Sequence, residues 1–172
     1  MSPMSPTDRE VEELEVGELL TDRIPVRRLT SGDLPAVVRI DAASTGEVRE
    51  DFYRAKLGRA LEDSSVQLSL AAELDDHLVG FLIVTFYYGE FGMPETVAVV
   101  EALGVHPEYR GRQVGKALMR QLEMNLRALG VESVRTEVGW EQLELLRFLA
   151  RMGFEPAPRF CLQKRLGREV ED

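Results

Sequence analysis

Hydrophobic side chains recur every three to four residues in four parts of the chain, and this spacing predicts helices. The clearest helix spans residues 114–129, where the apolar side chains share one face and Gly130 is placed to end it. An earlier helix begins near Leu34, directly after residues suited to capping. Two further helices are predicted over residues 49–61 and 141–152.

Runs rich in β-branched, aliphatic and aromatic residues predict six strands. They span residues 24–29, 66–73, 78–87, 97–105, 134–138 and 159–166. The second and third runs are separated by the turn sequence Asp75, Asp76 and His77, so we expect them to form a hairpin. The run over residues 97–105 is apolar except where Glu101 and Gly104 interrupt it.

The first 22 residues differ in composition from the rest of the chain. They contain two prolines and seven acidic residues against a single basic one, Arg9. Such a segment has too few apolar residues to build a core, and we expect residues 1–22 to form a disordered or loosely helical tail. Residues 23–172 are expected to form one domain, since 172 residues with 44% hydrophobic residues suit a single packed core.

Charge and cysteine content exclude several classes of protein. A formal net charge of −9 argues against a nucleic-acid binder. The single cysteine, Cys161, allows neither an intrachain disulfide nor a clustered-cysteine metal site, and the two histidines lack metal-ligand spacing, so no metal is expected. We find no signal peptide and no long apolar run, which predicts a cytoplasmic protein that does not associate with membranes.

Basic residues gather where the strand ending at Val105 leads into the helix over residues 114–129. The basic residues are Arg110, Arg112 and Lys116, at a helix start where acids are usually favoured. Gly111 and Gly115 lack a Cβ atom and would let an anion approach the free backbone amides closely. The pattern indicates a phosphate-bearing ligand; the alternative is an ordinary solvated helix start.

The run over residues 103–119 resembles the acetyl-CoA signature of the GNAT superfamily of N-acetyltransferases. In the family pattern Gln or Arg is followed after two residues by Gly, then by one residue and Gly or Ala. Arg110 and Gly115 match this pattern, while Gln113 stands where the first glycine is usual. Glutamine in place of glycine keeps the backbone amide donor and adds a side chain, so we expect an altered approach of the phosphate and not a loss of binding. The resemblance extends from Ile24 to Leu166 and includes the segment 148–154, similar to the family's closing helix-to-strand segment.

The resemblance implies an α/β (α+β) fold with a mixed, largely antiparallel sheet and helices on both faces. The strand ending at Val105 would splay from the strand starting near Val134, and the pantetheine arm of acetyl-CoA would lie between them. By the same resemblance, Leu103 and Val105 would bond the pantetheine amides through their backbone. The residues expected around the pyrophosphate are Arg110, Gly111, Arg112, Gln113, Val114, Gly115 and Lys116.

Acetyl transfer to nitrogen requires a neutral amine. A lysine side chain is only about one part in a thousand neutral near pH 7.4, a deficit of roughly 4 kcal/mol, whereas an α-amine lacks well under about 1 kcal/mol. A strong base is therefore needed chiefly for side-chain amines.

Glu101 is the leading candidate for the base. It precedes Arg110 by nine residues, which is where histone-acetylating relatives carry their general base. The alternative is a glutamate that faces solvent or forms a salt bridge. Glu137, near the end of the neighbouring strand, is the second candidate, and Glu90 on the loop after the hairpin is a third. Either could share the base role or bind a cationic substrate; the alternative is an exposed charge on a sheet or loop.

The usual general acid of the family is absent. Many members use a tyrosine of the last helix to protonate the leaving thiolate, and Leu149 occupies the matching position. Tyr53, Tyr87, Tyr88 or Cys161 could replace it only if folding brings one of them to the site. Water or backbone groups are the other routes to the thiolate.

These patterns predict an acetyl-CoA-dependent N-acetyltransferase in which a bound amine, from a small molecule or a peptide, attacks the thioester directly. The acidic surface favours a cationic acceptor. Two alternatives remain open: a non-catalytic acyl-CoA-binding or regulatory module of the same fold, and a peptide-binding or dimerisation domain without a cofactor. An exposed final strand over residues 159–166 would also allow a homodimer through edge pairing.

Overall fold

The structure is a computed structural model that describes residues 23–62, 68–88, 92 and 94–166. The chain divides into two compact units, Met1–Glu137 and Val138–Asp172, and each is described by itself. The expected acidic tail and the candidate Glu90 lie outside the described residues. No helix in the described part of the chain is both long and apolar enough to cross a membrane.

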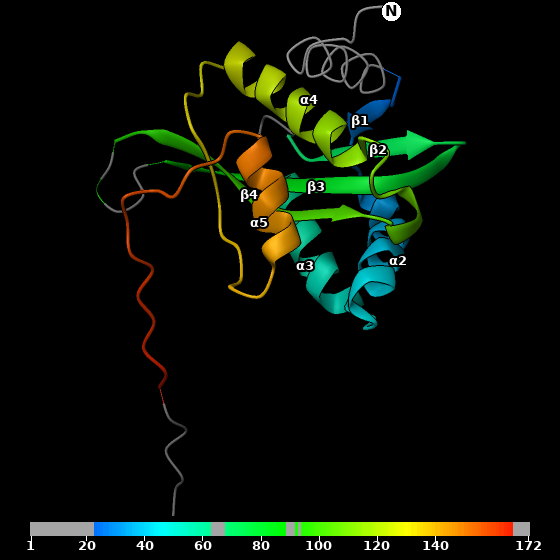
Figure 1. The fold of residues 1–172 in the computed structure, drawn as a ribbon, viewed down its shortest axis with the longest axis horizontal. Coiled ribbons are helices and arrows are strands. Elements are labelled where there is room, and N and C mark those ends of the chain that lie inside the picture. Colours follow the sequence, from blue (N-terminus) through cyan, green and yellow to red (C-terminus); the bar gives the residue numbers. More distant parts are fainter. Residues whose placement is uncertain (1–22, 63–67, 89–91, 93, 167–172) are drawn as a thin grey trace, which may run out of the picture. The chain divides into compact units, whose positions relative to one another are not determined.

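The first unit is built on a five-stranded sheet (Figure 1). Its strands are β1 (Val26–Arg28), β2 (Leu70–Leu74), β3 (His77–Tyr88), β4 (Thr96–Val105) and β5 (Val134–Thr136), and they lie in this order across the sheet. The first four pair antiparallel, and β4 pairs parallel with β5. This confirms the expected mixed, largely antiparallel sheet, including the hairpin of β2 and β3.

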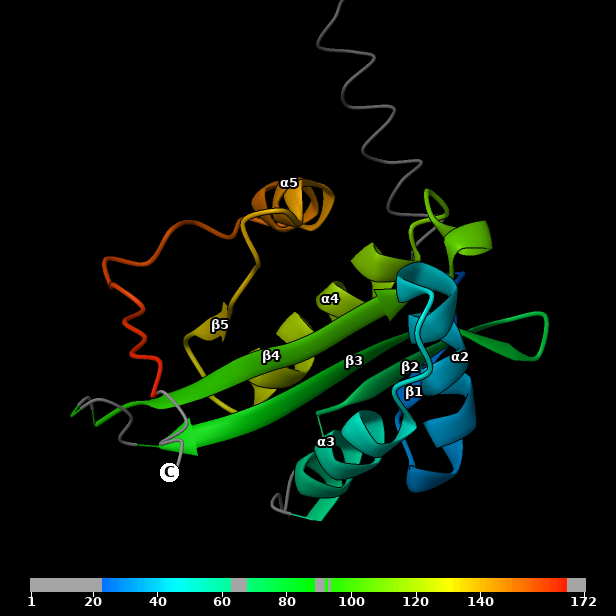
Figure 2. The ribbon, with the colours of Figure 1, turned by 90° about the horizontal axis from the view of Figure 1, so that it is seen from below.

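Helices cover both faces of this sheet, as Figure 2 shows. On one face lie α2 (Leu34–Thr45) and α3 (Glu50–Glu62), and on the other lies α4 (Val114–Ala128). The α2 and α3 side holds a buried cluster that includes Ile40 and Leu57 from the helices and Phe81 and Ile83 from β3. Five residues of the predicted apolar stripe are buried in α4: Val114, Ala117, Leu118, Leu122 and Leu126. Met119 is buried as well, whereas Leu129, the last residue of the predicted stripe, is 45% exposed.

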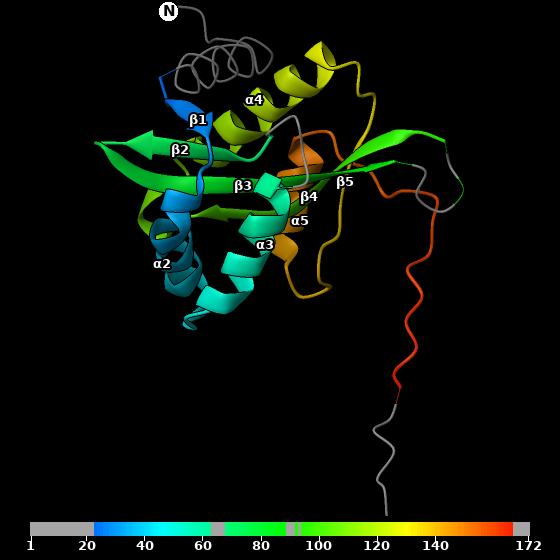
Figure 3. The same ribbon diagram turned by 180° about the vertical axis from the view of Figure 1, so that it is seen from behind.

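A buried carboxylate joins α2 to α3, which lie side by side in Figure 3. Asp41 is 7% exposed and accepts hydrogen bonds from Arg49 Nε (2.8 Å) and Tyr53 Oη (2.9 Å). Because these bonds favour the charged carboxylate, the pKa of Asp41 is lowered although burial alone would raise it. The network fixes α3, and with it the side chains that α3 presents to the sheet.

Strand β4 carries two local features that its apolar sequence did not predict. Val100 pairs with Val84 and Ala102 pairs with Ile83, which leaves Glu101 as the extra residue of a β-bulge. Three residues beyond Glu101, Gly104 lies against the ring of Phe81, and a Cβ atom there would come within 2.7 Å of Phe81 Cζ.

The parallel pairing of β4 with β5 is short, since it covers only Ala98, Val99 and Val100 of β4. From Glu101 to Val105, β4 continues along β3 while β5 has ended at Thr136. We call residues 101–105 the open edge of β4, because no described strand pairs with that side of them. The splayed strand pair expected from the family resemblance is therefore present.

The second unit contains the helix α5 (Leu143–Arg151), within the span predicted from spacing, and Gly153 follows it with φ of 86°. The strand predicted over residues 159–166 is wrong, because this segment forms no strand in the structure. Its apolar residues Phe160 and Leu162 are 95% and 90% exposed. Alternating side chains favour a strand only where a neighbouring strand supplies backbone hydrogen bonds. The homodimer expected from edge pairing of this strand therefore has no support from the structure.

Candidate functional site

The loop between β4 and α4 is held in place by backbone and ring contacts. The amide of His106 donates a 2.9 Å hydrogen bond to the carbonyl of Val79, and the short helix η3 (Pro107–Tyr109) follows. The guanidinium of Arg112 lies 5.1 Å from the centre of the Tyr109 ring. These contacts fix the chain as it enters α4.

The backbone at the start of α4 leaves several amides without a partner in the helix. The first intrahelical bond runs from the amide of Ala117 to the carbonyl of Gln113 (2.9 Å), so the amides of Val114, Gly115 and Lys116 have no intrahelical acceptor. Gly111, with φ of 74°, has open space where a Cβ would be. The expected pyrophosphate residues therefore do gather at one amide-rich turn, which suits an anion.

Gln113 adopts φ of 66°, a left-handed conformation that favours glycine. This backbone geometry supplies a physical reason for the glycine that the family pattern carries at this position. The left-handed conformation of Gln113 therefore destabilises the folded protein by about 1 kcal/mol relative to glycine at this position, while the backbone amide stays in place. The sequence shows that Gln113 replaces the usual glycine, but only the backbone dihedral angle shows that this replacement strains the chain.

The basic side chains of this turn differ in their surroundings. Arg110 is exposed, and its Nη2 donates a 3.1 Å hydrogen bond to Ser44 Oγ on α2. Arg112 is exposed as well, while Lys116 is half-buried. Because Arg110 already has an acceptor, the backbone amides are the better anchors for an anion here, and the arginines add positive potential.

The peptide groups of Leu103 and Val105 point toward the open edge of β4. In an antiparallel pair, directly opposed residues alternate between bonded and non-bonded positions. The bond from His106 to Val79 makes the neighbouring pair of Val105 and Gly80 non-bonded, and the pair of Leu103 and Leu82 has the same character two residues earlier. Their amides and carbonyls therefore face away from β3 and are available to an extended ligand.

Glu101 lies at the inner end of the open edge, in the bulge. Its side chain is 12% exposed. Oε2 accepts a 2.7 Å hydrogen bond from Lys56 Nζ on α3, and Oε1 accepts a 3.0 Å hydrogen bond from Tyr87 Oη on β3. Burial alone would raise the pKa of Glu101, but hydrogen bonds from Lys56, Tyr87 and Thr85 outweigh it and hold the pKa below its usual range.

The other candidates are placed differently. Glu137 follows β5 with an exposed side chain and is not among the residues that bond Glu101. Tyr53 bonds Asp41, Tyr88 is 77% exposed, and Cys161 is exposed in the second unit. Of the candidate acids, Tyr87 is the one that the fold brings to Glu101.

Lys56 is the residue of this cluster that sequence reasoning missed. It lies 45 residues from Glu101 in the chain, on a helix whose prediction gave no reason to single it out. Its ammonium group is also 5.3 Å from the centre of the Phe52 ring, a cation–π distance. Only the packing of α3 on the sheet brings these groups together.

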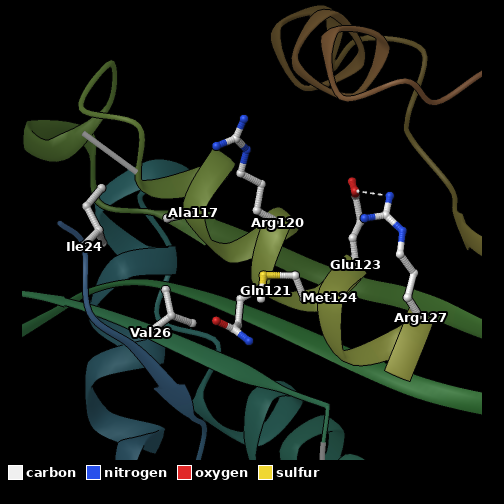
Figure 4. Close-up of a pocket in the computed structure, with 8 residues that line it drawn as sticks. All are labelled: Ile24, Val26, Ala117, Arg120, Gln121, Glu123, Met124 and Arg127. Atoms are coloured by element: carbon white, nitrogen blue, oxygen red, sulfur yellow. Dashed lines mark hydrogen bonds and ion pairs between the residues drawn. The ribbon is translucent and has the colours of Figure 1, made fainter. Parts of the chain in front are cut away.

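A groove of about 670 Å³ lies elsewhere on the first unit, between α4 and the chain at β1 (Figure 4). Ile24 and Val26 line one side, and α4 residues that include Met124 and Arg127 line the other. Arg127 forms a 3.2 Å ion pair with Glu123. None of the residues predicted to bind acetyl-CoA or act in catalysis lines this groove, and within the described residues no cluster of His, Cys, Asp and Glu could hold a metal ion.

Comparison with known families gives a match to the acetyltransferase (GNAT) family over residues 34–154. The matched region contains α2 to α5, all of β2 to β5, the open edge of β4 and the amide-rich turn. It covers well over half of the 172 residues.

Several solved structures share the fold. An aminoglycoside N-acetyltransferase, AAC(6')-Iy, in complex with CoA is 18% identical, with a TM-score of 0.67 over 83% of this chain and 95% of that one. A ribosomal-protein-alanine N-acetyltransferase from Brucella melitensis biovar Abortus 2308 is 21% identical, with a TM-score of 0.64 over 84% and 99%. Ard1 from Thermoplasma volcanium is 24% identical, with a TM-score of 0.64 over 77% and 82%. At these identities the similarity shows the fold alone.

Proposed function

The chain belongs to the acetyltransferase (GNAT) family of acetyl-CoA-dependent acyltransferases, and from this membership we propose that it transfers the acetyl group of acetyl-CoA to an amine by direct attack. The observation that carries the proposal is the order of three features along one stretch of chain: the carboxylate of Glu101, the open edge of β4 and the amide-rich turn. Each part suits one part of a donor: amides for the pyrophosphate, the edge for the pantetheine, and the carboxylate for the reacting end.

The strand geometry supports this order. Leu103 and Val105 offer their amides and carbonyls on the side of β4 where no described strand pairs with them. Val105 lies four residues along the strand from Glu101, a length of about 13 Å at about 3.3 Å per residue. A donor anchored at the turn and extended along this edge would bring its thioester toward Glu101, where the edge closes at the Val100 pair with Thr136.

The reaction then needs one group that accepts the proton of the amine and one group that donates a proton to the leaving thiolate. The amine nitrogen bonds the carbonyl carbon, the carbon–sulfur bond breaks, and the sulfur leaves with the electron pair. We assign the surplus proton on nitrogen to Glu101, with Glu137 as the second candidate. Because Leu149 stands in place of the usual tyrosine, the thiolate takes its proton from water or from Tyr87, which already lies at the cluster.

The acceptor is an amine, and the net charge of −9 favours a cationic one. Among the structural relatives, one is named for aminoglycosides and another for the alanine of a ribosomal protein, so the same fold serves both small-molecule and protein amines. The fold therefore leaves both acceptor classes open.

An amine panel tests the proposal. The purified protein is incubated with acetyl-CoA and with single amines, and both free thiol and acetylated product are measured. We expect stoichiometric thiol and product with at least one amine, and a loss of both in Gly115→Val, in which a β-branched side chain crowds the amide-rich turn.

The two rival functions predict different results. A non-catalytic acyl-CoA-binding module would show a CoA-induced thermal shift without product. A domain without a cofactor would show no shift, whereas CoA at about 100 times its dissociation constant should stabilise a true binder by about 2.7 kcal/mol.

A further inference from the structure

Both oxygens of the Glu101 carboxylate are already bonded within the protein. Oε2 accepts from Lys56 Nζ at 2.7 Å, and Oε1 accepts from Tyr87 Oη at 3.0 Å. The two charged side chains are largely shielded, with 12% of Glu101 and 23% of Lys56 exposed. The ammonium also lies 5.3 Å from the centre of the Phe52 ring. This is a packed ion pair rather than a loose surface contact.

The groups that face Glu101 come from two elements. Lys56 on α3 supplies a full positive charge, and Tyr87 and Thr85 on β3 supply neutral donors. All of them favour the charged carboxylate, and the pKa of Glu101 is lowered despite its burial. A carboxylate held in this state is a weak proton acceptor.

A weak proton acceptor distinguishes amines that must be deprotonated before they attack from amines that are already partly neutral. A lysine side chain has a pKa about six units above that of an ordinary carboxyl, so direct proton transfer from its ammonium to such a carboxylate is unfavourable by a factor of about 10⁶. The lowered pKa of Glu101 makes the transfer less favourable still. An α-amine with a pKa of about 8 is already about one-fifth neutral at pH 7.4 and needs no such transfer before it attacks.

We propose that Lys56 is a specificity-determining residue: by occupying Glu101 it restricts the acceptor to amines that are substantially neutral at neutral pH, and the acceptor is the α-amino group of a peptide or protein. This rests on the proposed acetyl transfer. It names which class of amine the site accepts and the side chain that sets the choice.

The chemistry balances with a weak base. The neutral α-amine bonds the carbonyl carbon of the thioester, the carbon–sulfur bond breaks, and the thiolate leaves with the electron pair. Once nitrogen has bonded the carbonyl carbon its N–H is strongly acidic, so Glu101 accepts that proton in spite of its lowered pKa and passes it to solvent. A lysine ammonium, by contrast, would have to lose a proton before any bond forms.

The experiment compares two peptides of one sequence. One has a free α-amine and no lysine; the other has a blocked N-terminus and a single lysine side chain. The ratio of kcat/KM for the α-amine peptide to that for the lysine peptide is measured at pH 7.4. The neutral fractions alone set this ratio at about 10², and we expect the wild type to reach at least that value.

Variants at position 56 then test the role of Lys56. Lys56→Met removes the charge, so burial raises the pKa of Glu101 and makes it a stronger base. We expect the α-to-ε ratio to fall at least tenfold and the acidic limb of the kcat/KM profile to move to higher pH. Lys56→Arg keeps the charge and should keep the ratio. Lys164→Met, which removes one exposed positive charge of the second unit, is the control.

Because both peptides are measured on the same preparation, a partial loss of folded protein cancels from the ratio; if Lys56→Met does not fold, Lys56→Gln replaces it. A wild type that prefers the lysine peptide, or a ratio unchanged in the charge-removing variant that is measured, overturns the inference while acetyl transfer stands. A wild type that acetylates neither these peptides nor any amine of the panel overturns the proposed function, and this inference with it.

Discussion

The hydroxyl group of Thr136 donates a 2.9 Å hydrogen bond to the backbone carbonyl of Val100. These two residues form the last pair between β4 and β5, and the open edge of β4 begins at the next residue, Glu101. The side-chain bond therefore fastens the two strands at the point where they part. In the proposed function, this is the end of the path along which the donor lies.

Thr136→Val should loosen this junction, because it removes the hydroxyl and keeps the shape. We expect the free energy of unfolding to fall by about 1 kcal/mol, the usual net value of one such bond. Thr136→Ser keeps the hydroxyl and should retain more of that stability than valine. Urea denaturation of the three proteins measures the effect, and equal losses in both variants would mean that the bond does not contribute.

The ion pair of Glu101 should make stability depend on pH in a defined window. The pKa of Glu101 is lowered in the folded protein, so its contribution is complete above the unfolded pKa of about 4.3 and is lost as the pH falls through the folded value. Glu101→Gln cannot titrate, and should be less stable than the wild type by about 1–3 kcal/mol at pH 7.

The difference between wild type and Glu101→Gln should then stay constant from pH 7 to about pH 5 and shrink below about pH 4.3. Chemical denaturation at a series of pH values measures it. A difference of the same size at pH 3.5 and pH 7 would show that the charge of Glu101 contributes nothing to the folded state.

Gln113→Gly should relieve the left-handed conformation at the start of α4. The gain of about 1 kcal/mol is partly offset because glycine also loosens the unfolded chain, so we expect a net increase in stability of roughly 0.5 kcal/mol. Gln113→Ala removes the side-chain atoms beyond Cβ without relieving the backbone and is the matched control. If glycine and alanine change the free energy of unfolding alike, backbone strain is not the cause.

Gly104→Ala should disturb the contact between β4 and the buried ring of Phe81. A Cβ atom would lie 2.7 Å from Phe81 Cζ, and the ring is 1% exposed and has little room to move. We expect a loss of about 1–3 kcal/mol. Gly58→Ala on α3, where nothing lies within 4 Å, should instead gain about 0.5–1 kcal/mol from helix propensity. Thermal unfolding should move the two variants in opposite directions.

Gly115→Val should abolish the CoA-induced thermal shift, since the new side chain blocks the approach of phosphate to the amides of α4. Arg112→Ala should weaken CoA binding about tenfold, or about 1.4 kcal/mol, through the loss of positive potential. Arg127→Ala, near the other end of α4, removes the same charge far from the turn and should bind CoA normally. A folded Gly115→Val protein with unchanged CoA affinity would contradict the site assignment.

The sequence by itself determined the elements that depend on local spacing. The 3.6-residue stripe of α4 and the hairpin of β2 and β3 need only their own residues to be recognised, because side-chain periodicity and turn residues act over short distances. The basic, glycine-containing turn at residues 110–115 was also visible, because its motif is contiguous in the chain. These features were enough for the fold class and for the family.

Tertiary structure decided what depends on partners distant in the chain. The ion pair of Glu101 with Lys56 spans 45 residues, and the bulge that aims Glu101 at α3 follows from the register of β4 against β3. The expected final strand shows the reverse case: alternating side chains over residues 159–166 suit a strand, but the segment forms no strand in the structure. A hydrogen-bonded ladder and an ion pair are properties of two segments, and one segment's sequence cannot specify them alone.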